Sequence, residues 1–162
     1  MQSKKSLEKF YSKDDPWGYE TNNDDKIRKE IILRSLHELD CRFEKALDIG
    51  AGQGFVTRDL PAEEIYAYEI SEKACNRLPK GIKVVKEIDG KFDLIIATGV
   101  LYKQYDYEGI LKIIRKHSSK YVLTCNIQPW EKNDLDESRI VYQEIFPYRE
   151  YLERLVIYNF SK

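Results

Sequence analysis

Short apolar runs alternate with polar, helix-like segments along most of this chain. Apolar and branched residues gather in five such runs, at residues 46–49, 65–68, 82–86, 92–97 and 121–126. Hydrophobic residues recur at helical spacing between residues 27 and 39 and again between residues 110 and 114. Strands that alternate with helices predict an α/β protein, in which a mostly parallel sheet is covered by helices.

The connections between these runs are short. Residues 55–60 allow only a short helix before Pro61, and residues 71–78 predict a second helix with Ser71 as its N-cap. Only a few residues separate the runs at 82–86 and 92–97, so no helix fits between them. We therefore expect a Rossmann-like doubly wound sheet of reduced size, in which some helices are shortened or missing.

The last third of the chain predicts a different kind of pairing. Residues 140–146 and 155–160 are both strand-like and are joined through Pro147 and the three residues after it. This spacing predicts an antiparallel pair that closes the sheet. The 162 residues form one domain by size. Within it we distinguish an N-terminal aromatic arm at 1–25 from a Rossmann-like core at 26–162.

The two longer predicted helices, between residues 27 and 39 and between residues 106 and 117, have clear start signals. Asp24 or Asp25 is a suitable N-cap for the first helix, whose apolar side would contain Ile27, Ile31, Ile32, Leu36 and Leu39. Most of the charged residues on this helix are expected to face solvent. A later helix is expected to begin at Asp106 or Tyr107 and to end in a basic turn, which suits the helix dipole.

Residues 46–57, with the sequence ALDIGAGQGFVT, carry the strongest chemical signal. An apolar run ending in an acid leads to glycines at 50, 52 and 54, so this segment predicts a strand, a tight turn and a helix. Gly50 and Gly52 supply backbone angles and a closeness of approach that side chains forbid, and the free N–H groups of the following helix face the loop. This is the pattern of a nucleotide site.

The spacing distinguishes between nucleotides. The glycines follow G-x-G-x-G instead of the dinucleotide pattern G-x-G-x-x-G, and Asp48 stands two residues before the first of them. A carboxylate there repels a pyrophosphate but can hold an ammonium. Glu69 ends the run at 65–68, where a carboxylate can accept hydrogen bonds from both hydroxyls of a ribose. Glu69 alone fits NAD equally well, whereas its combination with Asp48 favours S-adenosylmethionine.

In its order and spacing of motifs the core resembles the class I S-adenosylmethionine-dependent methyltransferases. The resemblance covers residues 46–57, 65–69 and 92–102. The aromatic residues of the arm further resemble those of nodulation-type N-methyltransferases and related small-molecule methyltransferases. The resemblance implies a cofactor site that contains Asp48, Gly50, Ala51, Gly52, Glu69, Ile70 and Thr98. It also implies an acid after the third strand that contacts the adenine amino group, and either Glu87 or Asp89 can take that place.

Two further groups are assigned to the cofactor. The arm contains Tyr11, Trp17 and Tyr19, whose rings either fasten the arm to the core or form a lid with an aromatic wall near the sulfonium. The family resemblance favours the lid. Arg28 stands near the start of the first core helix and is our candidate for a bidentate partner of the methionine carboxylate, with an ordinary solvated residue as the alternative.

Composition narrows the possible partners. The 27 basic and 28 acidic residues give a net charge of −1, so no overall field attracts nucleic acid or an anionic membrane. The three cysteines are odd in number and widely spaced, which predicts reduced thiols, no metal and a cytoplasmic setting. No apolar run approaches the length of a membrane span.

The residues after the fourth strand narrow the reaction. Thr98-Gly99-Val100-Leu101-Tyr102 lacks the proline-rich clamp of aminopurine methyltransferases, and no cysteine follows a proline. We therefore predict direct methyl transfer to a small-molecule acceptor, on nitrogen or oxygen, with Tyr19 and Tyr102 as wall and orienting groups. Two alternatives remain: an NAD-binding Rossmann domain, and a noncatalytic module that binds the cofactor or a partner protein.

Overall fold

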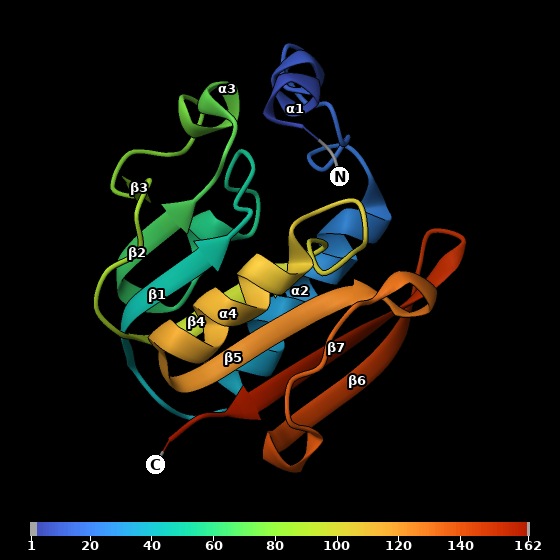
Figure 1. The fold of residues 1–162 in the computed structure, drawn as a ribbon. Coiled ribbons are helices and arrows are strands. Elements are labelled where there is room, and N and C mark those ends of the chain that lie inside the picture. The colour runs from blue at the N-terminus through green and yellow to red at the C-terminus, as the bar shows by residue number, and fades with distance from the viewer. Residues whose placement is uncertain (1–2, 162) are drawn as a thin grey trace.

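The computed structural model describes residues 3–161, in which seven strands form one mixed sheet in the order β3-β2-β1-β4-β5-β7-β6 (Figure 1). The strands are β1 (Phe43–Ile49), β2 (Ala62–Tyr68), β3 (Lys83–Val85), β4 (Phe92–Thr98), β5 (Ser118–Ile127), β6 (Ile140–Tyr148) and β7 (Tyr151–Asn159). The helices are α1 (Lys4–Phe10), α2 (Asn23–His37), α3 (Glu72–Cys75) and α4 (Tyr107–His117), with single 3-10 turns η1 (Thr57–Asp59), η2 (Gln128–Trp130) and η3 (Glu137–Arg139). Only β7 pairs in antiparallel fashion, with β5 on one side and β6 on the other. The predicted fold class is confirmed.

The strand order contains a switch point beside β1. The chain runs outward from β1 through β2 to the edge strand β3, and then returns to place β4 on the other side of β1. Ligands of open α/β sheets bind at such a point, outside the carboxyl ends of the strands. The loop after β1 and the loop after β4 therefore meet at one end of the sheet.

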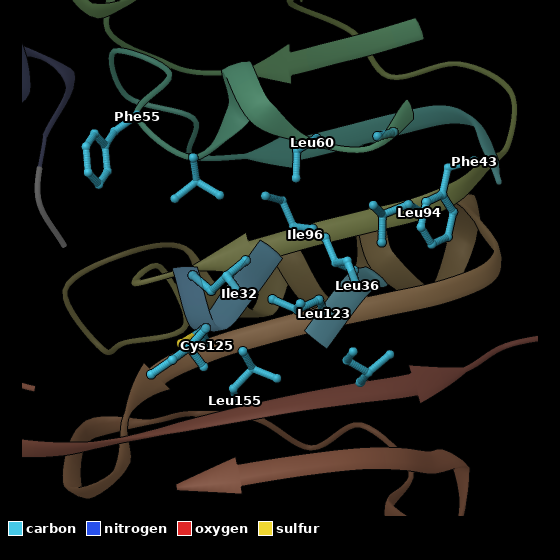
Figure 2. Packing of buried hydrophobic residues seen from close by; sticks show 14 of the residues in the cluster. Ile32, Leu36, Phe43, Phe55, Leu60, Leu94, Ile96, Leu123, Cys125 and Leu155 are labelled. Atoms are coloured by element: carbon cyan, nitrogen blue, oxygen red, sulfur yellow. The ribbon is translucent and has the colours of Figure 1, made fainter. Parts of the chain in front are cut away.

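Strand β4 is buried on both faces, as its continuous apolar sequence predicts. Leu94 and Ile96 belong to the cluster on the α2 side, and Ile95 and Ala97 to the cluster on the α4 side. Figure 2 shows the first cluster, in which side chains of α2 pack against β4 and its neighbours at Ile32, Leu36, Leu94, Ile96 and Leu123. This packing fixes both helices relative to the switch point.

The start of α2 differs from the prediction. The N-cap is Asn22, whose side chain accepts a hydrogen bond from the Asp24 N–H at 2.8 Å, so capping by Asp24 or Asp25 was wrong. Asp25 is instead buried and accepts hydrogen bonds from Tyr148 and Arg149. The β6–β7 hairpin supplies these partners, and helical periodicity within α2 cannot reveal a partner that is so distant in sequence.

The helices between the strands are short, as expected, and two are shorter than predicted. The 55–60 segment forms only the single turn η1, and α3 ends at Cys75 although Ser71 caps it as predicted. Residues 86–91 connect β3 to β4 without a helix, and Ile88 packs against the core there. Helix α4 begins after Asp106, whose carboxylate accepts from the Gly109 N–H at 3.0 Å.

Cys41, Cys75 and Cys125 are free thiols. Within residues 3–161, no group of three or more histidine, cysteine, aspartate or glutamate side chains is placed to hold a metal ion. In the same range, no helix combines the length and the apolar character needed to cross a membrane.

Candidate functional site

A cavity of about 240 Å³ lies at the carboxyl ends of β1, β2 and β4. Its walls come from the N-terminal arm, the loops after these three strands and the first turns of α4. The lining residues are Leu7, Tyr11, Trp17, Tyr19, Ile49, Gly50, Tyr68, Glu69, Ile70, Thr98, Gly99, Val100, Tyr105, Asp106, Gly109, Ile110 and Ile113. The cavity contains seven of the predicted site residues, and it lies at the predicted end of the sheet.

The glycine loop after β1 lies in close contact with the loop after β4 and with the N-terminal arm. Gly50 has φ +77°, and a Cβ there would lie 2.5 Å from Val100 Cγ1, in the loop after β4. Gly52 has φ +55°, and its Cβ would lie 2.9 Å from the Tyr11 hydroxyl of the arm. Side chains at these two positions would collide with the cavity wall and with the arm. The predicted reason for glycine therefore applies at both positions.

Glu69 lines the cavity at the end of β2, and two backbone groups hold its carboxylate. The Gly52 N–H donates to Oε2 and the Ser71 N–H donates to Oε1, both at 2.9 Å. A carboxylate has about four acceptor sites, so lone pairs remain for further donors. The side chain is thus fixed in orientation and still able to accept hydrogen bonds from a diol.

Asp48 is almost fully buried, with 3% of its surface exposed. Its Oδ2 accepts a hydrogen bond from Thr57 Oγ1 at 2.6 Å, while Oδ1 has no partner in the described chain. Burial raises the pKa of Asp48 to about 7, against the lowering effect of the Thr57 hydrogen bond. Asp48 does not line the cavity, but Ile49 and Gly50 directly after it do. An unpartnered buried oxygen is costly, so this site favours a ligand that brings a donor.

The arm forms one wall of the cavity. Trp17 Nε1 donates to the Tyr11 hydroxyl at 3.1 Å, and the Trp17 and Tyr19 rings stack with centroids 6.1 Å apart. Arg149 holds this segment by donating to the Trp17 carbonyl at 3.1 Å, and Lys4 and Glu72 pair across α1 and α3, which lie side by side in Figure 1. The rings therefore fasten the arm to the core and also line the cavity.

Arg28 lies outside the cavity lining, and the expectation of a solvated residue is wrong. It is 7% exposed, whereas Ile27, expected on the apolar side, is 50% exposed. Arg28 Nε donates to Glu153 Oε2 at 2.5 Å and Nη2 donates to the Cys125 carbonyl at 3.3 Å. Although burial lowers it, the charge of Glu153 raises the pKa of Arg28 well above its ordinary value.

Several other predicted residues do not line the cavity. The hydroxyl of Tyr102 accepts a hydrogen bond from the Ile127 N–H at 2.7 Å, so this side chain supports the end of β5. Glu87 and Asp89 are both exposed, and Asp89 accepts from the Gly90 N–H. Ala51 and Gly52 belong to the glycine loop without contributing to the lining. Neither Tyr102 nor Glu87 is therefore placed to touch a molecule inside this cavity.

Ten of the lining residues were not predicted from the sequence: Leu7, Ile49, Tyr68, Gly99, Val100, Tyr105, Asp106, Gly109, Ile110 and Ile113. Three of these lie on one face of α4, and their spacing of one, three and four residues was a usable signal. Tyr105 follows Tyr102 by three residues in an irregular loop, where no periodicity indicates which ring faces inward.

The strand order, the glycine loop after β1 and the acid after β2 together define a class I S-adenosylmethionine-dependent methyltransferase fold. The model of the family described as DREV methyltransferase matches residues 23–155. The chain therefore belongs to the DREV methyltransferase family, and it is an S-adenosylmethionine-dependent methyltransferase. This finding confirms the class and the cofactor that the sequence predicted.

Solved structures show the same fold at low sequence identity. The N-methyltransferase NodS from Bradyrhizobium japonicum WM9, in complex with S-adenosyl-l-homocysteine, matches with a TM-score of 0.77 and 16% identity over 98% of both chains. Magnesium protoporphyrin IX methyltransferase (ChlM) from Synechocystis PCC 6803, with bound SAM, matches with a TM-score of 0.72 and 14% identity over 98% of this chain and 97% of its own. A putative RNA methyltransferase, PH1948 from Pyrococcus horikoshii, matches with a TM-score of 0.66 and 15% identity over 100% of both chains. A search of curated protein sequences gave no match.

Proposed function

We propose that the chain transfers a methyl group from S-adenosylmethionine, held in this cavity, to a small-molecule acceptor, on nitrogen or oxygen. The main support for this proposal is the chemistry of the residues that line the cavity. Five of the lining residues are aromatic, two are carboxylates, and none of the described ones is lysine or arginine. Ring faces and carboxylates attract a sulfonium cation. A lining without cations offers no counter-charge to a pyrophosphate or a nucleic-acid backbone.

The residues present fit the cofactor. Glu69 is placed to accept the ribose hydroxyls, because its orientation is fixed and its lone pairs are not exhausted. Asp48 Oδ1, buried without a partner, suits the ammonium of the methionine end. Gly50, Ile70 and Thr98 complete the walls. When bound, S-adenosylmethionine supplies a methyl group on a sulfur that is already an activated leaving group.

The task left to the chain is alignment and the exclusion of water. Tyr11, Trp17 and Tyr19 cover one side of the cavity, so they separate the transferred group from solvent. Burial raises the pKa of Tyr19 to about 12, so its hydroxyl remains protonated at neutral pH. Tyr19 can therefore orient an acceptor through a hydrogen bond without taking its proton.

An amine acceptor that arrives as an ammonium must lose a proton before it can attack. Asp106 is an exposed carboxylate in the lining, and it can receive a hydrogen bond from such an amine. The N-methyltransferase activity named for NodS supports nitrogen as the accepting atom, and ChlM is named for a small-molecule substrate. PH1948 is named as a putative RNA methyltransferase, but a lining with two carboxylates and no lysine or arginine among the described residues favours a small molecule here.

The test is a labelling experiment with S-adenosylmethionine that carries a labelled methyl group. The protein is incubated with an extract of the source cells that has been separated by filtration into small molecules and macromolecules. We expect label in a compound of the small-molecule filtrate, which mass spectrometry then identifies. Label in protein or RNA would contradict the proposed acceptor class. Cofactor binding without label in either fraction would favour the alternative, a noncatalytic module that binds the cofactor or a partner.

A further inference from the structure

Arg28 and Glu153 form a buried ion pair that joins the first core helix to the last strand. Arg28 lies in α2 and Glu153 in β7, and 7% and 2% of their surfaces are exposed. Arg28 Nε donates to Glu153 Oε2 at 2.5 Å. Cys125 Sγ contacts the same carboxylate oxygen at 3.3 Å, and the Tyr148 ring packs on the guanidinium at 5.5 Å from its centroid. Groups from β5, β6 and β7 therefore hold this guanidinium of α2 in one orientation.

The guanidinium lies beside Gly99, a residue of the cavity wall. The Cys125 carbonyl accepts two hydrogen bonds, one from the cavity-lining Gly99 N–H at 2.8 Å and one from Arg28 Nη2 at 3.3 Å. A Cβ built on Gly99, which has φ +71°, would lie 3.8 Å from Arg28 Nη2. Among the described residues, and apart from the chain neighbours of Gly99, no other atom lies within 4 Å of that position, so Arg28 Nη2 borders the space that a side chain on Gly99 would occupy. Arg28 also lies near enough to Asp48 for its charge to lower the pKa of that carboxyl.

An ion pair buried this deeply needs a reason other than stability. Removing two charges from water costs about as much as their attraction returns, and apolar residues of similar volume are often equally stable. What the pair does supply is a fixed arginine, which is suited to bind a carboxylate with two parallel hydrogen bonds. Fixing the side chain beforehand also reduces the entropy lost when a ligand binds.

We propose that Glu153 is a positioning residue, which holds Arg28 beside Gly99 so that its guanidinium binds the carboxylate of the methionine end of the cofactor. The inference rests on the proposed function, because it places that end of the cofactor next to Gly99. Asp48 and Arg28 then receive the two charged groups of one amino acid, the ammonium and the carboxylate. Glu153 touches neither group and acts only through Arg28.

The experiment compares two ligands that differ at this end. S-Adenosylhomocysteine carries the amino-acid group, whereas 5′-methylthioadenosine ends at a methylated sulfur. Titration calorimetry measures both affinities in the wild type and in Glu153→Gln, which removes the charge and keeps the shape. We expect the affinity for S-adenosylhomocysteine to fall about tenfold, which corresponds to about 1.4 kcal/mol. The affinity for methylthioadenosine should stay within about twofold, since its contacts lie elsewhere.

A double variant tests whether Glu153 acts through Arg28. The combination of Arg28→Met with Glu153→Gln should bind S-adenosylhomocysteine no more weakly than Arg28→Met alone, because the second change removes nothing that remains in use. Additive losses would overturn the positioning role. Glu153→Asp keeps the charge pair but withdraws the carboxylate by one methylene. It should therefore also weaken binding of S-adenosylhomocysteine relative to binding of methylthioadenosine. This variant carries the test if Glu153→Gln does not fold.

Glu131→Gln is the matched control. The side chain of Glu131 is only 7% exposed, and its partners are Asn126, Asn133 and Arg154 instead of Arg28 or Tyr148. It should leave the ratio of the two affinities unchanged. If neither Glu153 variant changes the ratio of the two affinities, including the case in which both ligands lose affinity equally, the inference is overturned. If neither ligand binds the wild-type protein, the proposed cofactor site itself fails, which is a distinguishable result.

Discussion

The β1–β2 side of the cavity and the Arg28–Glu153 ion pair beside Gly99 are built in different ways. On the β1–β2 side, Gly50, Gly52 and Glu69 lie within twenty residues of one another, and backbone N–H groups hold the carboxylate. In the ion pair, Arg28 and Glu153 are 125 residues apart and meet only because α2 and β7 pack together. The β1–β2 side is therefore formed by residues that are close in sequence, whereas the ion pair forms only after α2 has packed against β7.

This difference has physical consequences. The local side depends on backbone conformation and close approach, so small steric changes should disturb it most. The Arg28–Glu153 pair depends on charges that are removed from water, so changes of charge should disturb it most. The predictions below address these two dependences, beginning with the largest expected effect.

Gly50→Ala should weaken binding of S-adenosylhomocysteine about ten- to a hundredfold. The new Cβ would lie 2.5 Å from Val100 Cγ1, so a lining residue must move, at a cost of about 1–3 kcal/mol. Gly90→Ala is the matched control, because Gly90 also has φ +77° but has nothing within 4 Å of a built Cβ. Both variants should lose about 1–2 kcal/mol of unfolding free energy from backbone strain. Equal affinities in the two variants would refute the steric account of the loop.

Asp48 should make the stability of the unliganded protein depend on pH. Its pKa rises from 3.8 to about 7 on folding, because burial disfavours the charged form. The stabilisation is therefore complete below about pH 4 and is lost as the pH rises through about 7. Relative to Asp48→Asn, the wild type should lose unfolding free energy over this window, with each pKa unit equivalent to about 1.4 kcal/mol. Urea unfolding at several pH values measures the difference, and a constant difference would contradict the burial of this carboxyl.

Binding should change the same carboxyl. A ligand ammonium beside Asp48 Oδ1 favours the charged form, so S-adenosylhomocysteine should release protons when it binds below about pH 7. Calorimetry in buffers with different ionisation enthalpies counts these protons. Methylthioadenosine, which has no ammonium, should release fewer. Equal proton release by the two ligands would place the ammonium elsewhere.

Tyr102→Phe should have the smallest effect on binding. The Tyr102 hydroxyl accepts a hydrogen bond from the Ile127 N–H and does not line the cavity. Its removal leaves a backbone donor unpaired, which should cost about 1–2 kcal/mol of unfolding free energy. The affinity for S-adenosylhomocysteine should remain within about twofold. A large loss of affinity with unchanged stability would restore Tyr102 to the site.

The sequence predicted the parts of the site that depend on neighbouring residues. The glycine loop after the first strand, Glu69 at the end of the second and the antiparallel closing pair all follow from local patterns, and each has the predicted place in the fold. The partner of Arg28 could not be predicted, because only the packing of α2 against the β6–β7 hairpin brings Glu153 to it. The exposure of Ile27 has the same origin, since the hairpin attracts the polar side of the first turns of α2 instead of its isoleucine.

Irregular loops are the second reason why part of the site could not be predicted from the sequence. Tyr102 and Tyr105 lie three residues apart after β4, and no alternation or helical period decides which ring faces the cavity. Either Glu87 or Asp89 was expected near the adenine from the family resemblance. The segment after β3 instead turns back toward β4 without a helix, which leaves both of them exposed. In both cases the backbone path decides the outcome.

The most direct test of the account is the affinity of Glu69→Ala for S-adenosylhomocysteine, measured by titration calorimetry beside Glu63→Ala. Glu63 lies in β2, the strand that Glu69 directly follows, and it is exposed, so its replacement removes the same charge away from the cavity. The account predicts a loss of about a hundredfold for Glu69→Ala, since two charge-assisted hydrogen bonds to the ribose disappear, and no change for Glu63→Ala. Equal affinities in the two variants would show that the cofactor does not bind at the carboxyl end of β2.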